Sequence, residues 1–169
     1  MNIHKVTETD DFNAIGEIYA QSWKTACRGI VPQDFLDELA GSRWAKVLSG
    51  SKYDSYVIRE DRKYIGTSSI GAAREEKMAG WGEIISIYLL PEYFGKGYAE
   101  PLFKRAVNAL CEKGCTNIYL WVLNENIRAQ RFYEKHGFHN SGEAALIDIA
   151  GAELTEIRYI KNIVTGETK

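Results

Sequence analysis

Cysteine is scarce in this chain of 169 residues, and the features that identify metal or disulfide proteins are missing. The three cysteines, Cys27, Cys111 and Cys115, are odd in number, and no pair of cysteines or histidines has the spacing of zinc ligands. The sequence therefore predicts buried or free thiols and no metal site.

An excess of one charge and long apolar runs are also absent. A formal net charge of −2 leaves no basic patch of the kind that would favour a nucleic-acid partner. No apolar run approaches the roughly 20 residues that span a bilayer, and the mixed start at residues 1–6 is strand-like and unlike a signal peptide. We therefore expect a cytoplasmic protein with neither a membrane nor a nucleic acid as its partner.

What is present is the composition of one compact domain. The chain is 45% hydrophobic and 26% charged, which is ordinary for a soluble globular protein, and no linker, repeat or low-complexity tract interrupts it. We expect a single domain over residues 1–163 and a loose C-terminal tail over residues 164–169.

Apolar periodicity predicts alternating strands and helices, which is typical of an α/β domain. After a first strand we expect a helix capped by Asp10 or Asp11, and then a second helix that extends through residues 35–48. A hairpin that turns at 60–63 follows, and then a strand over 81–90 and a helix from residue 99. The last predicted elements are a strand over 118–123, a short helix before Gly137 and a closing hairpin that turns at Ala150 and Gly151. Helices should cover both faces of the apolar strand 81–90.

The most informative segment joins the strand at 81–90 to the helix that follows. It contains Gly95, Lys96 and Gly97 in succession. The glycines allow consecutive backbone N–H groups to point into one concavity, and the start of the helix adds unpaired N–H donors and the positive end of the helix dipole. The segment therefore predicts an anion site of the kind that cradles a diphosphate.

Two common phosphate-binding patterns do not fit this segment. A Walker A loop needs Ser or Thr after its lysine, and here Gly97 follows Lys96. A dinucleotide fingerprint needs glycine where Glu100 stands. A nucleotide-binding protein is therefore a disfavoured alternative.

A second segment, residues 120–138, matches another sequence pattern and makes the role of the glycine segment more specific. Its matching residues follow the order Asn-x-x-Ala-x-x-Phe-Tyr-x-Lys-x-Gly-Phe and are Asn126, Ala129, Phe132, Tyr133, Lys135, Gly137 and Phe138. Together the two segments resemble the GNAT-type N-acetyltransferases, a superfamily that uses acetyl-CoA. The resemblance is specific over residues 83–138 and loose before them.

The resemblance implies which residues bind the acetyl-CoA co-substrate. In that family the first segment reads Gln/Arg-x-x-Gly-x-Gly/Ala and wraps the CoA pyrophosphate. The matching residues here are Phe94, Gly95, Lys96, Gly97, Tyr98 and Ala99. Phe94 departs from the family pattern, which has Gln or Arg at that position. Asn126 is implied to bind the pantetheine or pyrophosphate region, and either it or Asn124 can alternatively cap the helix that follows.

The resemblance also implies the GNAT acyl-CoA N-acyltransferase fold, an α/β fold. Its mixed central sheet has splayed parallel central strands, with helices on both faces. The splayed strands would be residues 81–90 and 118–123, which leave a slot for the pantetheine arm. The main chain at Leu89 and Leu90 would face the pantetheine amides and the thioester carbonyl, where an N–H group stabilises negative charge on the oxygen.

Amide formation requires a proton acceptor and a proton donor. An alkyl amine has a pKa of about 10.4 and must lose a proton before its lone pair can attack. Glu83 is the candidate general base because family members often carry one at this position, and Glu143 and Asp148 are reserves. The alternative for Glu83 is a strand-end carboxylate that is solvated or paired. Tyr133 stands where the family places the tyrosine acid that protonates the CoA thiolate.

We therefore expect an enzyme that moves acetyl from acetyl-CoA directly to a primary amine, on a small molecule first and on a peptide or protein N-terminus second. A non-catalytic acyl-CoA sensor that retains the cradle is an alternative of a different class, and the departure at Phe94 slightly favours it. No segment names the acceptor or indicates an interface, so a homodimer, common in the family, stays open.

Overall fold

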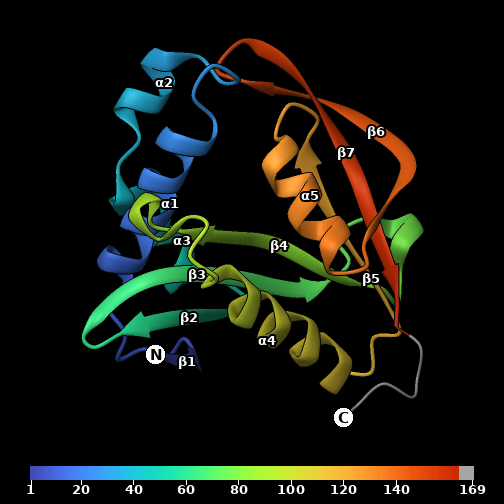
Figure 1. The fold of residues 1–169 in the computed structure, drawn as a ribbon, viewed down its shortest axis with the longest axis horizontal. Helices are drawn as coiled ribbons and strands as arrows, with labels where there is room; N and C mark the ends of the chain where they lie inside the picture. The colour runs from blue at the N-terminus through green and yellow to red at the C-terminus, as the bar shows by residue number, and fades with distance from the viewer. Residues whose placement is uncertain (164–169) are drawn as a thin grey trace.

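The computed structural model describes residues 1–163, which fold around one seven-stranded sheet of order β1-β2-β3-β4-β5-β7-β6 (Figure 1). The strands are β1 (Asn2–Lys5), β2 (Asp54–Glu60), β3 (Lys63–Ala72), β4 (Gly82–Leu89), β5 (Asn117–Leu123), β6 (His139–Ile149) and β7 (Ala152–Asn162). Within the described residues β4 and β5 form the one parallel pair, and the other neighbours are antiparallel. The tail predicted over residues 164–169 lies outside the described residues.

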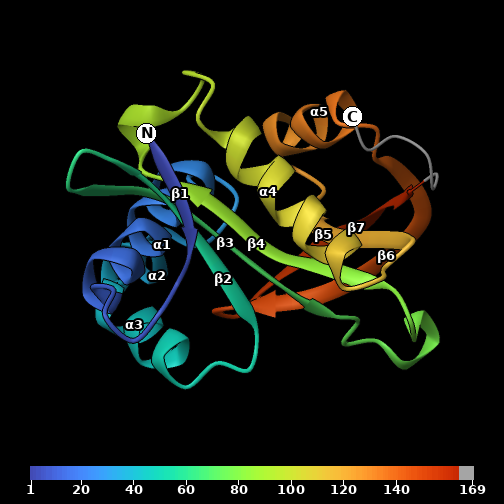
Figure 2. The same ribbon diagram turned by 90° about the horizontal axis from the view of Figure 1, so that it is seen from below.

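Helices cover both faces of the sheet, as expected (Figure 2). They are α1 (Phe12–Ala26), α2 (Gln33–Glu38), α3 (Gly41–Ser49), α4 (Ala99–Glu112) and α5 (Ile127–Lys135), together with the short turns η1 (Glu76–Met78) and η2 (Pro91–Tyr93). α1 to α3 lie on one face, and α4 and α5 lie on the other. No helix in the described part of the chain is long and apolar enough to cross a membrane.

The two central strands splay apart, which confirms the slot that was predicted between them. β4 and β5 pair at Gly82 with Ile118 and at Glu83 with Tyr119. Beyond this point β4 stays with β3 and β5 stays with β7. The β3–β4 ladder shifts register between Ser69 and Ile70 at a bulge, and bulges bend a strand away from its neighbour. The resulting gap opens toward the loop that precedes α4.

One predicted element is wrong in its extent. The second helix, expected to run through residues 35–48, is two helices, α2 and α3, separated by extended backbone at Leu39 and Ala40. The break brings Gly41 against Gly16 of α1 so closely that a Cβ on Gly16 would lie 2.2 Å from the Gly41 carbonyl oxygen. A helix that ran straight through would not make this close approach of two glycine backbones.

The cap of α1 is Asp11, one of the two predicted alternatives. The Asp11 carboxylate accepts hydrogen bonds from the N–H groups of Asn13 and Ala14, each at 3.0 Å. Asp10 instead pairs with His4 at 2.8 Å. The buried face of α1 includes Ile15 and Ile18, which anchor the helix on the sheet beside the slot.

Candidate active site

The loop before α4 has the backbone conformation that its glycines were expected to allow. Gly95 has a φ of +71° and Gly97 a φ of +87°, which favour glycine over residues with a Cβ. No atom lies within 4 Å of the place where a Cβ would stand on either residue, so the loop borders open space. Since the first N–H groups of α4 have no helical partner, the geometry fits a bound anion such as a diphosphate.

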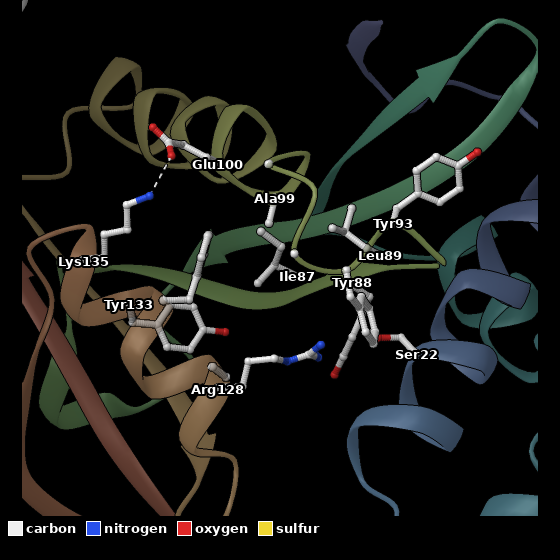
Figure 3. Close-up of a pocket in the computed structure, with 15 residues that line it drawn as sticks. Ser22, Ile87, Tyr88, Leu89, Tyr93, Ala99, Glu100, Arg128, Tyr133 and Lys135 are labelled. Carbon is white, nitrogen blue, oxygen red and sulfur yellow. Dashed lines mark hydrogen bonds and ion pairs between the residues drawn. The ribbon is translucent and has the colours of Figure 1, made fainter. Parts of the chain in front are cut away.

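A cavity of about 360 Å³ extends from this loop along β4 to α5 (Figure 3). The predicted binding residues that line it are Leu89, Phe94, Gly95, Gly97, Ala99 and Tyr133. Asn126 lines the neighbouring cavity, and its side chain also caps α5 by accepting from the Ala129 N–H at 3.2 Å. Leu90, Lys96 and Tyr98 line neither cavity, and the Tyr98 hydroxyl donates to Glu60.

The N–H groups of Leu89 and Leu90 point to opposite sides of β4. The Leu90 N–H donates to the carbonyl of Ile65 at 2.9 Å and is therefore engaged by β3. Leu89 faces Gly66 across the ladder. Because N–H groups of successive residues in an antiparallel pair point in opposite directions, the Leu89 N–H points away from β3 and into the slot. Of the two residues, Leu89 has the N–H available to an oxygen in the slot.

Tyr133 is buried at the side of the slot. The residue is 9% exposed, and its ring packs against Phe103 of α4, Phe138 and Tyr159 of β7. Its hydroxyl has no hydrogen-bond partner among the described residues and is directed at the space between α5 and β4 (Figure 3). Burial raises the pKa of Tyr133 to about 12. The phenol is therefore a protonated donor that lacks a protein acceptor.

The guanidinium of Arg128 lies against Phe94, the residue that departs from the family pattern. Its guanidinium carbon lies 3.9 Å from the centre of the Phe94 ring, and the side chain enters the slot between Tyr133 and Tyr88 (Figure 3). Arg128 lines both cavities. Burial lowers its pKa, and no carboxylate of the described chain pairs with it. Sequence analysis missed this residue. The available signal was its position in the first turn of a predicted helix, where the helix dipole disfavours a positive charge.

Two other lysines near the glycine loop share one carboxylate. Glu100 pairs with Lys104 at 2.8 Å and with Lys135 at 3.3 Å, and hydrogen bonds from these two lysines lower its pKa to about 2. Lys135 lines the first cavity and pairs with Glu100, which it shares with Lys104 (Figure 3). Of the cations in the described chain that line this cavity, Arg128 is the one without a carboxylate partner.

A second cavity of about 330 Å³ continues from Tyr133 beneath α1 to Glu83. Glu83 is 2% exposed and accepts hydrogen bonds from the Arg74 guanidinium at 2.6 Å and the Tyr119 hydroxyl at 2.8 Å. The Arg74 N–H adds a further bond at 3.1 Å. Burial by itself raises the pKa of Glu83, but the bonds from Arg74 and Tyr119 outweigh it and hold the pKa below its ordinary value. The predicted base is thus a paired carboxylate that lines the second cavity.

The reserve bases lie outside this cavity. Glu143 is half exposed and lies 3.5 Å from Lys77. Asp148 accepts from the Gly151 N–H in the turn of the closing hairpin. Glu156 of β7, which sequence analysis missed, does line the cavity, and burial raises its pKa. No local signal singled it out, because β7 also contains other charged residues, among them Glu153, Arg158 and Lys161.

The end of α1 and the closing hairpin lie together at one side of the second cavity. Buried Cys27, Val31 and Leu36 pack with Ile149 and Leu154 on either side of the β6–β7 turn. The segment between α1 and α2 meets this turn in Figure 1. Trp23 and Trp121 add aromatic walls to the cavity below. The described residues contain no group of three or more His, Cys, Asp or Glu side chains placed to share a metal ion.

The splayed strands, the glycine loop and the tyrosine beside the slot are the features that the resemblance to the N-acetyltransferases implied. The family model described as the acetyltransferase (GNAT) family matches residues 13–138, and the chain belongs to this family of N-acetyltransferases.

The chain is 26% identical over 150 residues to the uncharacterized N-acetyltransferase YuaI of Bacillus subtilis, covering 88% of this chain and 86% of that protein. It is 25% identical to a spermidine N(1)-acetyltransferase of Thermoplasma acidophilum, covering 76% of this chain and 83% of that one. The fold is that of the PaiA N-acetyltransferase of T. acidophilum solved with coenzyme A, with a TM-score of 0.69, 21% identity, and coverage of 96% of this chain and 99% of that one.

Proposed function

We propose that this protein transfers acetyl from acetyl-CoA directly to a primary amine of a small molecule. One observation carries the proposal: the two cavities meet at Tyr133, which lines both of them. The first cavity leads to the glycine loop, and the second leads to the carboxylates beneath α1. A donor in one cavity and an acceptor in the other would meet beside a single hydroxyl, which suits direct transfer in a ternary complex.

The residues at the first cavity fit acetyl-CoA, which supplies the activated acyl group. The open loop at Gly95 and Gly97 would receive the diphosphate on main-chain N–H groups, with Lys96 nearby. Arg128 would add the charge that Phe94 does not supply. The Asn126 amide N–H₂ remains free to donate, because its oxygen is the atom that caps α5. The Leu89 N–H would stabilise negative charge on the carbonyl oxygen of the acyl group.

Tyr133 serves the leaving thiolate mainly as a hydrogen-bond donor. Complete proton transfer from a phenol of pKa about 12 to a thiolate of pKa about 8.5 costs about 5 kcal/mol. A hydrogen bond from the same hydroxyl stabilises the developing charge without this cost, and solvent then delivers the proton. The absence of a protein acceptor for the hydroxyl leaves it available for this bond.

The second cavity, which we assign to the acceptor, fits an amine. Glu83 and Glu156 line it together with Arg74 and Arg128, and Trp23 and Trp121 flank it; since Arg74 pairs with Glu83, Glu156 is the carboxylate open to an ammonium group. A carboxylate attracts an ammonium group, and an aromatic face supplies a cation–π contact. The relative named as a spermidine N(1)-acetyltransferase supports amines of this kind. One of the two carboxylates takes the proton that the amine must lose.

The decisive experiment is thiol release from acetyl-CoA across a panel of amines. The panel contains polyamines, amino acids with side-chain amines, and peptides with free N-termini. Turnover with a small amine and none with peptides supports the proposal. Turnover with peptides alone would assign the protein to N-terminal acetylation, and the absence of turnover with measurable acetyl-CoA binding would make it a sensor.

A further inference from the structure

Glu156 is a half-buried carboxylate that faces the acceptor cavity without a partner. It lies on β7 opposite Leu123 of β5. Its carboxylate makes no hydrogen bond or ion pair within the described residues, and the charges of Arg74 and Glu83 act on it only from a distance. The neighbouring carboxylates are all engaged: Glu83 pairs with Arg74, and Glu75 binds Trp121 and Arg158.

Glu83 and Glu156, the two carboxylates of the cavity, lie at different positions along the slot. Glu83 lies level with Tyr119 where β4 and β5 still pair, at the closed end of the slot. Six residues separate it from Leu89, which is roughly 20 Å of strand at about 3.3 Å per residue. Glu156 is the cross-strand partner of Leu123, which is four residues further along β5 than Tyr119. Glu156 therefore lies farther than Glu83 from the closed end of the slot.

The surroundings of Glu156 favour uptake of a proton. Besides Glu156, the ionisable groups that line its cavity are Arg74, Glu83, Arg128, Tyr88, Tyr133 and Cys27, and burial raises the pKa of Tyr88. Arg74 is already matched by Glu83, and burial raises the pKas of Tyr133 and Cys27, which keeps both neutral at pH 7. Burial raises the pKa of Glu156 as well; the charge of Arg74 lowers it and the charge of Glu83 raises it, and burial is the largest of these effects. A carboxylate of raised pKa is a stronger base than an exposed one.

We propose that Glu156, rather than Glu83, is the general base that deprotonates the acceptor amine. The proposal rests on the acetyltransferase activity proposed above. The ammonium form of the acceptor gives one N–H proton to a carboxylate oxygen of Glu156, and the freed lone pair forms the new C–N bond as the C–S bond breaks. The thiolate leaves with a hydrogen bond from Tyr133. The nitrogen then loses its second proton, which passes through solvent to the thiolate and gives the neutral amide and the CoA thiol, and the proton held by Glu156 passes to solvent. Glu83 serves as a structural carboxylate that positions Arg74 and Tyr119.

The test compares three glutamine variants of otherwise identical protein with the best amine of the panel. Glu156→Gln removes the proposed base and Glu83→Gln removes the paired carboxylate. Glu153→Gln, on the same strand and exposed, is the matched control. We expect Glu156→Gln to lower kcat about a hundredfold at pH 7, and the loss to shrink as pH rises and more amine is already neutral. The dissociation constant of acetyl-CoA and the Tm check that the site and the fold are intact.

Several outcomes overturn the assignment. A loss of kcat below tenfold, a loss that is the same at every pH, or a rise in the KM of the amine at unchanged kcat each excludes Glu156 as the base. A pH-dependent loss in Glu83→Gln alone would assign the role to Glu83. If the wild-type protein binds acetyl-CoA but acetylates no amine, the proposed function fails rather than this assignment.

Discussion

The guanidinium carbon of Arg128 lies 3.9 Å from the centre of the Phe94 ring, so that α5 delivers a cation to the loop in front of α4. The family pattern has Gln or Arg at position 94. In this chain an aromatic ring occupies that position, and the positive charge comes from a residue 34 positions later. We propose that Arg128 supplies to acetyl-CoA the positive charge that Phe94 lacks.

Arg128→Met should weaken acetyl-CoA binding and leave acetyl-pantetheine binding unchanged. A charge-assisted hydrogen bond contributes about 1.5–3 kcal/mol, so the dissociation constant for acetyl-CoA should rise roughly tenfold to a hundredfold. Isothermal titration with both ligands measures the difference, and Arg131→Met, exposed on the same helix, is the control. Adding Phe94→Arg to Arg128→Met should restore affinity. Equal weakening for both ligands would contradict a contact with the phosphates.

Gly97→Ala should impair acetyl-CoA binding through the main chain alone. The φ of +87° costs a residue with a Cβ about 1–2 kcal/mol, although no atom stands in the way of the added methyl group. The loop is expected to relax and to lose the alignment of its N–H groups. Gly50→Ala is the control, because Gly50 has a φ of −106° and lies at the end of α3. A variant that binds acetyl-CoA like the wild type would remove the loop from the binding site.

Tyr133→Phe should lower kcat at least tenfold with little change in acetyl-CoA affinity or Tm. The hydroxyl has no hydrogen-bond partner in the described chain, so its removal leaves the packing against Phe103 intact. Tyr159→Phe is a suitable control, because that hydroxyl donates to Glu134 and its loss should reduce Tm without the loss of turnover. Unchanged kcat in Tyr133→Phe would exclude the tyrosine from the mechanism.

Glu83→Gln should destabilise the fold at neutral pH by about 1–3 kcal/mol, because a buried carboxylate loses its charge-assisted bonds with Arg74 and Tyr119. The folded pKa of Glu83 is depressed, so its contribution is fully present above the unfolded pKa of about 4.3 and is lost as pH falls through the folded pKa. Urea unfolding of both proteins at pH 7 and pH 3 measures the contribution of Glu83 to the free energy of unfolding.

The difference between Glu83→Gln and wild type should be large at pH 7 and smaller at pH 3. Glu76 is exposed on η1, and Glu76→Gln should leave the free energy of unfolding unchanged at pH 7 and at pH 3. A difference that persists undiminished at pH 3 would show that the charge of Glu83 does not stabilise the fold.

Local signals predicted most of the elements. The glycine loop into α4, the capped start of α5 and the turn at Ala150 and Gly151 depend on residues within a few positions of one another. Backbone conformation at such sites follows from the residues themselves, because glycine permits positive φ and asparagine supplies a cap. The break between α2 and α3 was not predicted, because it depends on contact with Gly16, 25 residues earlier.

The sequence by itself determined the family, the glycine loop and the position of Tyr133, since each follows from short-range spacing and apolar periodicity. Only the tertiary structure placed Arg128 on Phe94 and Glu156 across the slot from β4. The reason is physical: β7 enters the sheet between β5 and β6, and α5 packs beside the loop before α4, through contacts between residues far apart in the chain. Such long-range pairing depends on burial of the whole core, and no local pattern specifies it.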